Sequence, residues 1–124
     1  MNVYLINGNR DEVGIFSDAL KKVNGSISFA FALDEVEAMR YLSSNSSKLP
    51  DMVFISENHL LFLGNLRKHQ QFVNLPVTMY TNSTDPDHIE RALSLNAALL
   101  PRPNSYRELI VLLRRRFDLL IQKS

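Results

Sequence analysis

The sequence predicts an α/β sandwich, in which a parallel sheet is covered by helices on both faces. Short runs of apolar residues occur five times along the 124 residues, and each is followed by a segment whose apolar residues recur at helical spacing. Strands that are apolar on both sides are typical of buried parallel sheets. Because crossovers between parallel strands are right-handed, five such units predict a doubly wound sandwich.

The apolar runs place the strands at residues 3–6, 28–32, 52–55, 77–81 and 97–100. Helices are expected from a cap at Asn9 or Asp11 to Asn24-Gly25, from Asp34 to about residue 42, over Leu60 to Gln70, from Asp85-Pro86 to Asn96, and from Ser105 to about Gln122. Their apolar stripes are expected to face the core: Ile15, Phe16, Ala19, Leu20 and Val23; Val36, Met39 and Leu42; Ile89, Ala92, Leu93 and Leu95; Leu109, Leu112, Leu113, Phe117, Leu120 and Ile121.

Several helix ends carry specific capping signals. Asp34 with Glu37, and Ser105 with Glu108, have the spacing of a capping box. Asn96 stands where a left-handed residue commonly ends a helix. These signals fix the expected helix boundaries more firmly than hydrophobic periodicity alone.

Composition excludes several classes of function. A net charge of +1 gives no electrostatic case for nucleic acid or a membrane surface as the main partner. The lack of cysteine excludes disulfides, thiol catalysis and thiolate metal sites. The N-terminus turns polar too early for a signal peptide, and no apolar run approaches a membrane span, so a cytoplasmic location is expected. Residues 1–124 are expected to form a single domain without an output domain, since the sequence ends just past the last helix.

Three strings, in this order and spacing, resemble a response-regulator receiver domain, the phosphoacceptor module of two-component signalling in bacteria. They are Leu49-Pro50-Asp51-Met52-Val53-Phe54-Ile55, Leu75-Pro76-Val77-Thr78-Met79-Tyr80-Thr81 and Arg102-Pro103. The resemblance covers essentially the whole chain. It implies a flavodoxin-like (βα)5 sandwich with strand order 2-1-3-4-5, and it suggests a cis bond between Arg102 and Pro103.

The resemblance also places the family's phosphoacceptor and metal site. Ser56 stands at the position of the phosphoacceptor aspartate, and Asn7 and Gly8 stand at the positions of the acidic pair that binds Mg²⁺. A serine cannot form the acyl phosphate, and an amide with a glycine supplies no charge to a cation that prefers carboxylates. The expected consequence is a lost Mg²⁺ site.

The switch residues are only partly retained. Thr81 matches the threonine that contacts the phosphoryl group, and Arg102 replaces the lysine that pairs with it. Leu99 stands where the family usually has an aromatic switch. The turn after the phosphoacceptor is also missing, and residues 57–66 are about five residues short of a typical receiver. The sequence therefore predicts a pseudo-receiver that is not an enzyme and needs no cofactor.

Output is then expected through a protein partner acting in trans, a signalling kinase or an effector. In receivers the fourth helix, fifth strand and fifth helix commonly form the dimer or partner surface, which here means residues 87–97 and 106–123. Plausible rim charges are Arg91, Arg107, Arg114 and Arg115. A homodimer through this same face is the second possibility. Nucleic acid and membranes are not expected partners.

Two alternatives stay open. The chain could be a conventional phosphorelay response regulator that keeps a residual switch through Thr81 and Arg102. It could instead bind a small anion or other ligand in a pocket among Asn7, Ser56, Thr81 and Arg102. A nucleophilic role for Ser56 would need an adjacent base, for which His59 is the nearest candidate in sequence.

Other charged residues receive simpler interpretations. Asp11 and Glu12 fall in the first turn of the first helix, where carboxylates favour the positive end of the helix dipole. The three histidines, His59, His69 and His88, have no metal-ligand spacing and are expected on the surface. The run 114–116 is expected to form a solvated face.

Overall fold

The computed structural model describes residues 1–44 and 48–123, with side chains through Asp118. The strands are β1 (Asn2–Ile6), β2 (Ser28–Ala32), β3 (Met52–Ser56), β4 (Val77–Tyr80) and β5 (Ala97–Leu100). The helices are α1 (Arg10–Val23), α2 (Glu35–Ser44), α3 (Leu60–Arg67), α4 (Pro86–Ser94) and α5 (Tyr106–Lys123), with 3-10 turns η1 (Glu57–His59) and η2 (Gln70–Phe72) on either side of α3. None of the described helices is long and apolar enough to cross a membrane.

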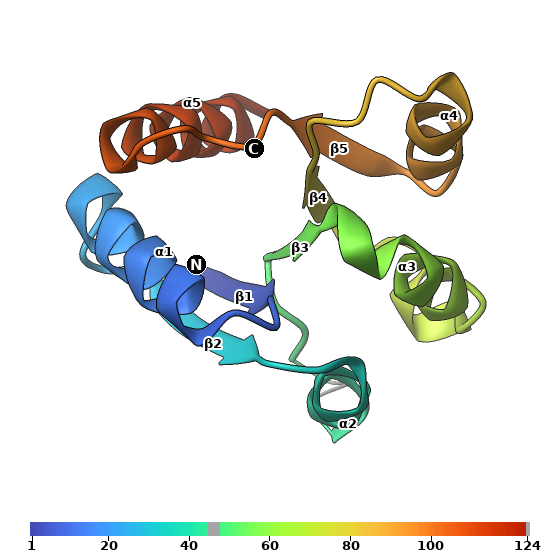
Figure 1. The fold of residues 1–124 in the computed structure, drawn as a ribbon. Helices are drawn as coiled ribbons and strands as arrows, with labels where there is room; N and C mark the ends of the chain where they lie inside the picture. The colour runs from blue at the N-terminus through green and yellow to red at the C-terminus, as the bar shows by residue number, and fades with distance from the viewer. Residues whose placement is uncertain (45–47, 124) are drawn as a thin grey trace.

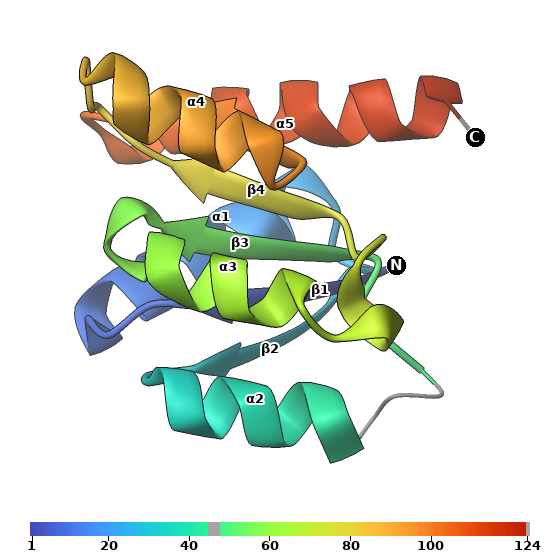
Figure 2. The ribbon, with the colours of Figure 1, turned by 90° about the vertical axis from the view of Figure 1, so that its right-hand side faces the viewer.

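The strands form one parallel sheet in the order β2-β1-β3-β4-β5, which confirms the predicted topology. Helices α1 and α5 cover one face of the sheet, and α2, α3 and α4 cover the other (Figures 1 and 2). The two edge strands, β2 and β5, leave β3 in the centre. This arrangement is the flavodoxin-like sandwich that the sequence predicts.

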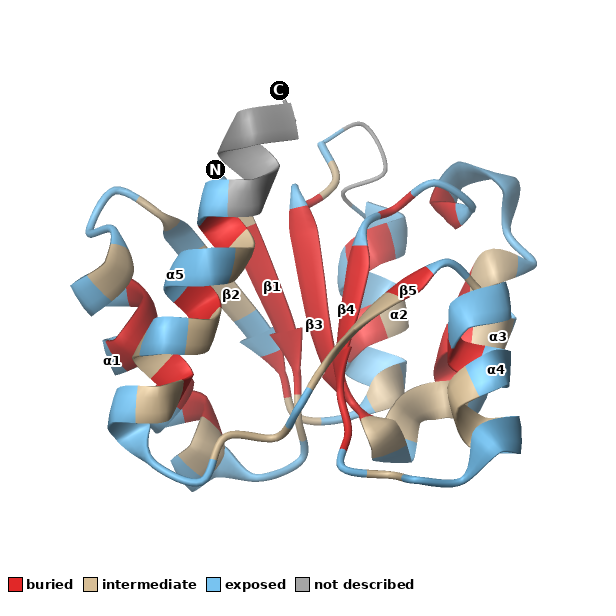
Figure 3. Cartoon of the chain, turned by 90° about the horizontal axis from the view of Figure 1, so that it is seen from above, coloured by how far each residue is buried: buried red, intermediate tan, exposed pale blue. Residues whose placement is uncertain are grey.

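Strand β3 is buried along its whole length, and β1 and β4 are largely buried too (Figure 3). The residues of β3 alternate between two cores because successive side chains of a strand point to opposite faces. Val53 and Ile55 belong to the cluster beneath α2, α3 and α4, whereas Met52 and Phe54 belong to the cluster beneath α1 and α5. This double burial explains why the strand reads as a continuous apolar run.

The cluster beneath α1 and α5 is built on aromatic rings. The ring of Phe54 packs edge-on against Phe16 with centroids 5.1 Å apart, and it stacks on Tyr80 at 5.7 Å. Phe117 of α5 completes the group at 6.3 Å from Phe54. Offset and edge-to-face pairs of this kind add to the stabilisation from burial.

The capping residues predicted at Asn9, Asp34, Ser105 and Asn96 are confirmed. Asn9 caps α1, its side chain accepting from the backbone N–H groups of Asp11 and Glu12 at 3.0 and 3.2 Å. Asp34 accepts from the N–H of Glu37 at 2.7 Å, and Ser105 does the same for Glu108 at 3.1 Å. Asn96, just past α4, has a φ of 60° and lies in the left-handed region, as expected.

Some of the predicted core-facing positions are wrong. Val36 is 69% exposed and Leu93 is 53% exposed, because α2 and α4 each bury only a narrow stripe centred on small or single apolar residues such as Ala38 and Ala92. Ile15 is 48% exposed at the outer side of α1. The third helix ends at Arg67 rather than Gln70, where the chain passes into η2. Leu120 and Ile121 have side chains outside the described residues.

Arg67 ties the amino-terminal side of the sheet together. Its Nε donates to the carbonyl of Leu95 at 2.8 Å, and its Nη1 donates to the carbonyls of Phe72 and Leu75 at 2.7 Å each. Longer bonds reach Val73 and Asn96. One guanidinium thus joins the end of α3 to the chain entering β4 and to the turn entering β5.

Replacing Arg67 with alanine should lower the free energy of unfolding by about 2–4 kcal/mol, since several half-buried carbonyls lose a charged donor at once. Lysine at this position should recover only part of the loss because it lacks the planar fork. Urea unfolding monitored by circular dichroism measures both changes. Lys68→Ala, at the exposed neighbouring residue, is the matched control, and an equal midpoint for Arg67→Ala and Lys68→Ala would contradict the assignment.

Candidate functional site

The polar residues that follow the strands meet at the carboxyl edge of the sheet. Ser56 is the last residue of β3, Asn7 directly follows β1, and Thr81 directly follows β4. Arg102 lies in the loop after β5. Parallel strands bring such residues to one edge, and this edge is where doubly wound folds bind ligands.

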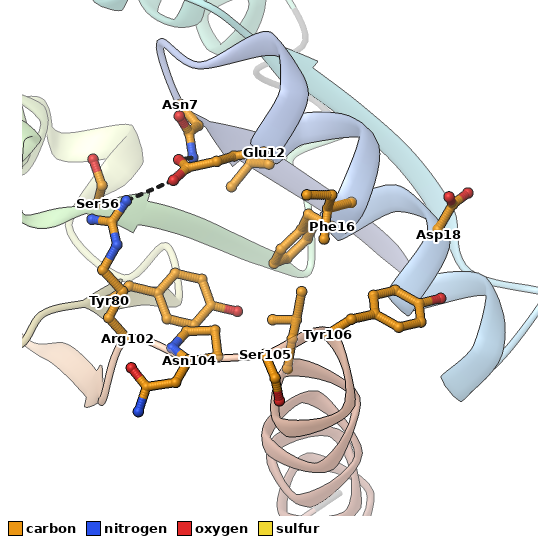
Figure 4. Close-up of a pocket in the computed structure, with 14 residues that line it drawn as sticks. Asn7, Glu12, Phe16, Asp18, Ser56, Tyr80, Arg102, Asn104, Ser105 and Tyr106 are labelled. Carbon is orange, nitrogen blue, oxygen red and sulfur yellow. Dashed lines mark hydrogen bonds and ion pairs between the residues drawn. The ribbon is translucent and has the colours of Figure 1, made fainter.

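A cavity of about 640 Å³ opens at this edge, between α1 and the start of α5 (Figure 4). Asn7, Ser56 and Arg102 line it, so three of the four residues of the predicted pocket are brought together. The full lining is Leu5, Asn7, Glu12, Ile15, Phe16, Asp18, Ser56, Tyr80, Arg102, Pro103, Asn104, Ser105, Tyr106 and Leu109.

Glu12 joins the two sides of the cavity mouth. Its Oε1 accepts from Nη2 of Arg102 at 2.8 Å, and its Oε2 accepts from Nδ2 of Asn7 at 2.9 Å (Figure 4). The hydrogen bond from Asn7 and the pairing with Arg102 outweigh partial burial, so the pKa of the Glu12 carboxyl lies below its usual value. The guanidinium of Arg102 is therefore already paired with a carboxylate of the protein.

Local structure frees Glu12 for this role. Asn9 and Glu12 have capping-box spacing, in which the glutamate would accept from the backbone N–H of Asn9. Here the side chain of Asn7 accepts from that N–H instead, at 2.8 Å. The Asn7 amide thus caps the turn with its oxygen and holds Glu12 with its nitrogen.

Ser56 is buried at 9% exposure, and its hydroxyl makes no hydrogen bond within residues 1–44 and 48–118. His59, the nearest candidate base, has its Nδ1 at 2.7 Å from the carboxylate of Glu35 on α2. His59 and His88 are both half-buried, so the prediction of surface histidines is wrong for these two residues and is confirmed for His69. The structure offers Ser56 no activated-nucleophile arrangement of the usual kind.

Thr81 does not line the cavity. Its hydroxyl donates to the carboxylate of Glu57 and accepts from the backbone N–H of Ser83 at 2.9 Å. Thr81 is buried at 9% exposure, and it fixes the loop that leads to α4. The predicted four-residue pocket therefore lacks this member.

Leu99 lies in β5 opposite Met79 and packs, half-buried, against the core beneath α2, α3 and α4. The backbone of Arg102 donates to the side chain of Asn82 at 2.9 Å. Within the described residues no peptide bond is cis, and the suggested cis bond before Pro103 is wrong.

The donors at this edge do not fit a Mg²⁺ ion. Asn7 and Ser56 are neutral, Gly8 has no side chain, and both carboxylate oxygens of Glu12 are engaged by Arg102 and Asn7. Mg²⁺ is usually held by one or two carboxylates that are free to ligate. Among the residues with described positions there is no group of three or more His, Cys, Asp or Glu side chains that could hold a metal ion.

The four predicted rim charges are exposed: Arg91 on α4 and Arg107, Arg114 and Arg115 on α5. These helices flank the edge strand β5 (Figure 1). The third arginine of the run, Arg116, is different, because its Nε donates to the hydroxyl of Thr78 at 3.2 Å and burial lowers its pKa. The run is therefore not a uniformly solvated face.

Three site residues escaped sequence reasoning in their present roles: Glu12, Glu57 and Tyr80. Glu12 and Arg102 are far apart in sequence, and Glu57 meets Thr81 across two strand ends. The Asn9–Glu12 spacing was a usable signal for Glu12, but it favours a local cap. Tyr80 reads as a strand residue, and nothing in its sequence context marks the cavity it lines.

Solved structures similar to this chain settle the fold. The phosphorylated cyanobacterial phytochrome response regulator RcpA is 16% identical, with a TM-score of 0.85 over 99% of this chain and 95% of that one. The chain has the receiver fold. The chemotaxis response regulator CheY4 of Vibrio cholerae is 20% identical, with a TM-score of 0.71 over 92% of this chain and 96% of that one. At these identities the likeness extends to the receiver fold alone.

Sequence comparisons add less. No family model matches the chain. An uncharacterized protein of Rattus norvegicus, the C8orf76 homolog, is 29% identical over 106 residues, which cover 81% of this chain and 28% of the rat protein. The chain thus corresponds to under a third of the length of that relative.

Glu12→Gln should remove a pH-dependent part of the stability. Because the folded pKa of Glu12 lies below its ordinary value of 4.5, the ionised carboxylate stabilises the fold above that pH and ceases to do so as the pH falls through the lowered value. The pair is partly exposed, so the expected difference from the unsubstituted chain is under about 1 kcal/mol near neutral pH and vanishes in acid. Urea unfolding at a series of pH values measures it. Asp11→Asn, in the same helix turn, is the control; a loss that persists unchanged in acid would contradict the prediction.

Proposed function

We propose that this chain is a receiver-like signalling module that acts by protein–protein contact, without aspartyl phosphorylation, in two-component-type signal transduction in the cytoplasm. The observation that carries the proposal is the Glu12–Arg102 ion pair, with Nη2 of Arg102 2.8 Å from Oε1 of Glu12. It occupies the carboxyl edge where the receiver fold would otherwise gather phosphate and metal ligands. The proposal includes a lost Mg²⁺ site and no enzymatic activity.

The contacts at this edge support phosphorylation independence. In the resemblance Thr81 and Arg102 are the groups that would meet a phosphoryl group, yet Thr81 donates to Glu57 and Arg102 is paired with Glu12. Breaking both contacts would leave the carboxylates of Glu57 and Glu12 without these partners. For Glu12, which is 39% exposed and keeps its bond from Asn7, the cost is under about 1 kcal/mol. The guanidinium of Arg102, which lies beside Ser56 in Figure 4, is already paired with Glu12.

The surface proposed for the partner is formed by α4, β5 and α5, with Arg91, Arg107, Arg114 and Arg115 as its charged rim. Two apolar residues on it, Leu93 and Val111, are exposed at 53% and 42%. Arginine is enriched at protein-binding surfaces, and both exposed apolar residues share their helices with these arginines. The arginines favour a partner with acidic residues at the matching positions.

Addition of Mg²⁺ with beryllofluoride should leave the amide NMR spectrum unchanged around Ser56, Thr81 and Arg102. The expectation follows because the carboxylates at this edge are engaged, Glu12 by Asn7 and Arg102 and Glu57 by Thr81. A receiver domain that retains its aspartate, treated in parallel, controls for the reagent. Saturable, Mg²⁺-dependent shifts at Ser56 and Thr81 would instead support the conventional phosphorelay alternative, as would transfer of labelled phosphate from a histidine kinase.

Charge reversal on the proposed surface tests the partner. The double variant Arg91→Glu/Arg115→Glu should weaken binding to a protein isolated with the unsubstituted chain by about tenfold or more, since like charges then face each other. The matched control is Arg10→Glu/Arg40→Glu, at exposed positions on α1 and α2. Titration by calorimetry measures both variants. An equal loss of affinity in the two double variants, or no loss in Arg91→Glu/Arg115→Glu, would mean that the partner binds elsewhere.

A further inference from the structure

The cavity between α1 and α5 has an interior that the proposed function does not use. Its deep end is made of buried apolar side chains, Leu5, Phe16 and Leu109, with the ring of Tyr80. Ile15 and Tyr106, both exposed, stand at its outer side. A volume of about 640 Å³ lies within the range of sites for small organic molecules, which are mostly apolar with a few placed polar groups.

Tyr80 supplies a polar group that the protein leaves unsatisfied. Its side chain is 8% exposed, and its hydroxyl is out of contact with solvent and has no hydrogen-bond partner in the described part of the chain. Figure 4 shows the hydroxyl directed toward the space that Phe16, Ser105 and Tyr106 surround. A buried hydroxyl without a partner costs free energy that a correctly placed ligand atom would recover.

Desolvation keeps this hydroxyl in its neutral form. Burial raises the pKa of Tyr80 above its usual value, and no charged side chain contributes to the shift. At neutral pH the group is therefore a phenol that can donate or accept one hydrogen bond. The neutral phenol carries no negative charge that would attract a cationic ligand.

The charges around the cavity do not favour an anion. Glu12 and Asp18 line it against a single cation, Arg102, and that cation is paired with Glu12. An anionic ligand would have to displace Glu12 from the guanidinium. The Arg102 pocket is thus unlike a free arginine poised to bind a carboxylate or phosphate.

Taken together, the lining favours a flat ligand. The rings of Phe16 and Tyr80 meet at 79° with centroids 6.2 Å apart, and so present one face and one edge as adjoining walls. A planar ring can stack on one and meet the other edge-on.

We propose that this cavity binds a small neutral molecule with a flat apolar ring body and one hydrogen-bonding group that pairs with the Tyr80 hydroxyl. The ring would lie among Phe16, Leu109 and Leu5, and the polar group would reach Tyr80 Oη after a small displacement of the side chains that keep solvent from it. The inference does not rest on the signalling role proposed above. Of the alternative left open by the sequence, a small anion or other ligand among Asn7, Ser56, Thr81 and Arg102, it keeps the ligand and proposes a class that needs no free charge.

Indole and indene test the proposal, because they share a shape while only indole carries an N–H group. Titration of the full chain, followed by methyl NMR signals of Leu5, Ile15 and Leu109, should give saturable shifts with both, and tighter binding for indole. Indoleacetate, which adds a carboxylate to the same ring, should bind more weakly than indole. Indoleacetate binding tighter than indole would overturn the neutral class.

Variants locate the binding and isolate the hydrogen bond. Tyr80→Phe removes only the unpaired hydroxyl, so the fold should persist, indole should bind about fivefold more weakly, and indene should be unaffected. Ile15→Trp should block the opening and abolish binding of both molecules. Val36→Trp, at an exposed position on α2, is the matched control and should bind normally.

The remaining outcomes would each overturn the proposal. Shifts that stay linear and spread over the surface would mean that no site exists. Undiminished binding to Ile15→Trp would place the site elsewhere, and equal losses of indole and indene in Tyr80→Phe would remove the hydroxyl from the recognition. A folded spectrum of each variant is the condition for comparing them.

Discussion

The double burial of β3 is the constraint on which the rest of the molecule depends. All five of its residues are buried, with two cores drawing on alternate side chains. A strand in this position can present chemistry only where it ends, and so can its neighbours β1 and β4. The polar groups that gather at the cavity mouth, Asn7, Glu12, Ser56 and Arg102, accordingly lie at a strand end, in the loop after it or in the first turn of the next helix, as in other doubly wound folds.

At the carboxyl edge of the sheet, the side-chain amide of Asn7 positions the neighbouring polar groups. Asn7 accepts from the backbone of Asn9 and donates to Glu12, and Glu12 in turn holds Arg102. The receiver fold is kept while the two charged groups at its carboxyl edge, Glu12 and Arg102, pair with each other. The two surfaces proposed for function, the face of α4, β5 and α5 and the aromatic cavity between α1 and α5, meet at the start of α5.

The features of the fold that depend on hydrogen bonds within a few residues could be predicted from the sequence. The strand order followed from the resemblance, while helix caps at Asn9 and Asp34 and the left-handed Asn96 follow from backbone hydrogen bonding within a few residues. The inward positions were wrong where a stripe was narrower than its pattern, as at Val36. The roles of Glu12 and Tyr80 could not be predicted, because an ion pair across 90 positions and an unpaired hydroxyl both depend on tertiary packing.

Arg67 gives the sheet two unequal ends. Its guanidinium gathers the carbonyls that precede β4 and β5, including those of Leu75 and Leu95, whereas the opposite ends of the same strands run into loops beside the cavity. At the carboxyl end the same two strands are joined by a hydrogen bond from the backbone N–H of Thr81 to the carbonyl of Leu100 at 3.0 Å, and by one from the backbone N–H of Arg102 to the side chain of Asn82 at 2.9 Å. β4 and β5 are therefore held together at both ends, by one charged side chain where they begin and by single neutral hydrogen bonds where they end beside the cavity.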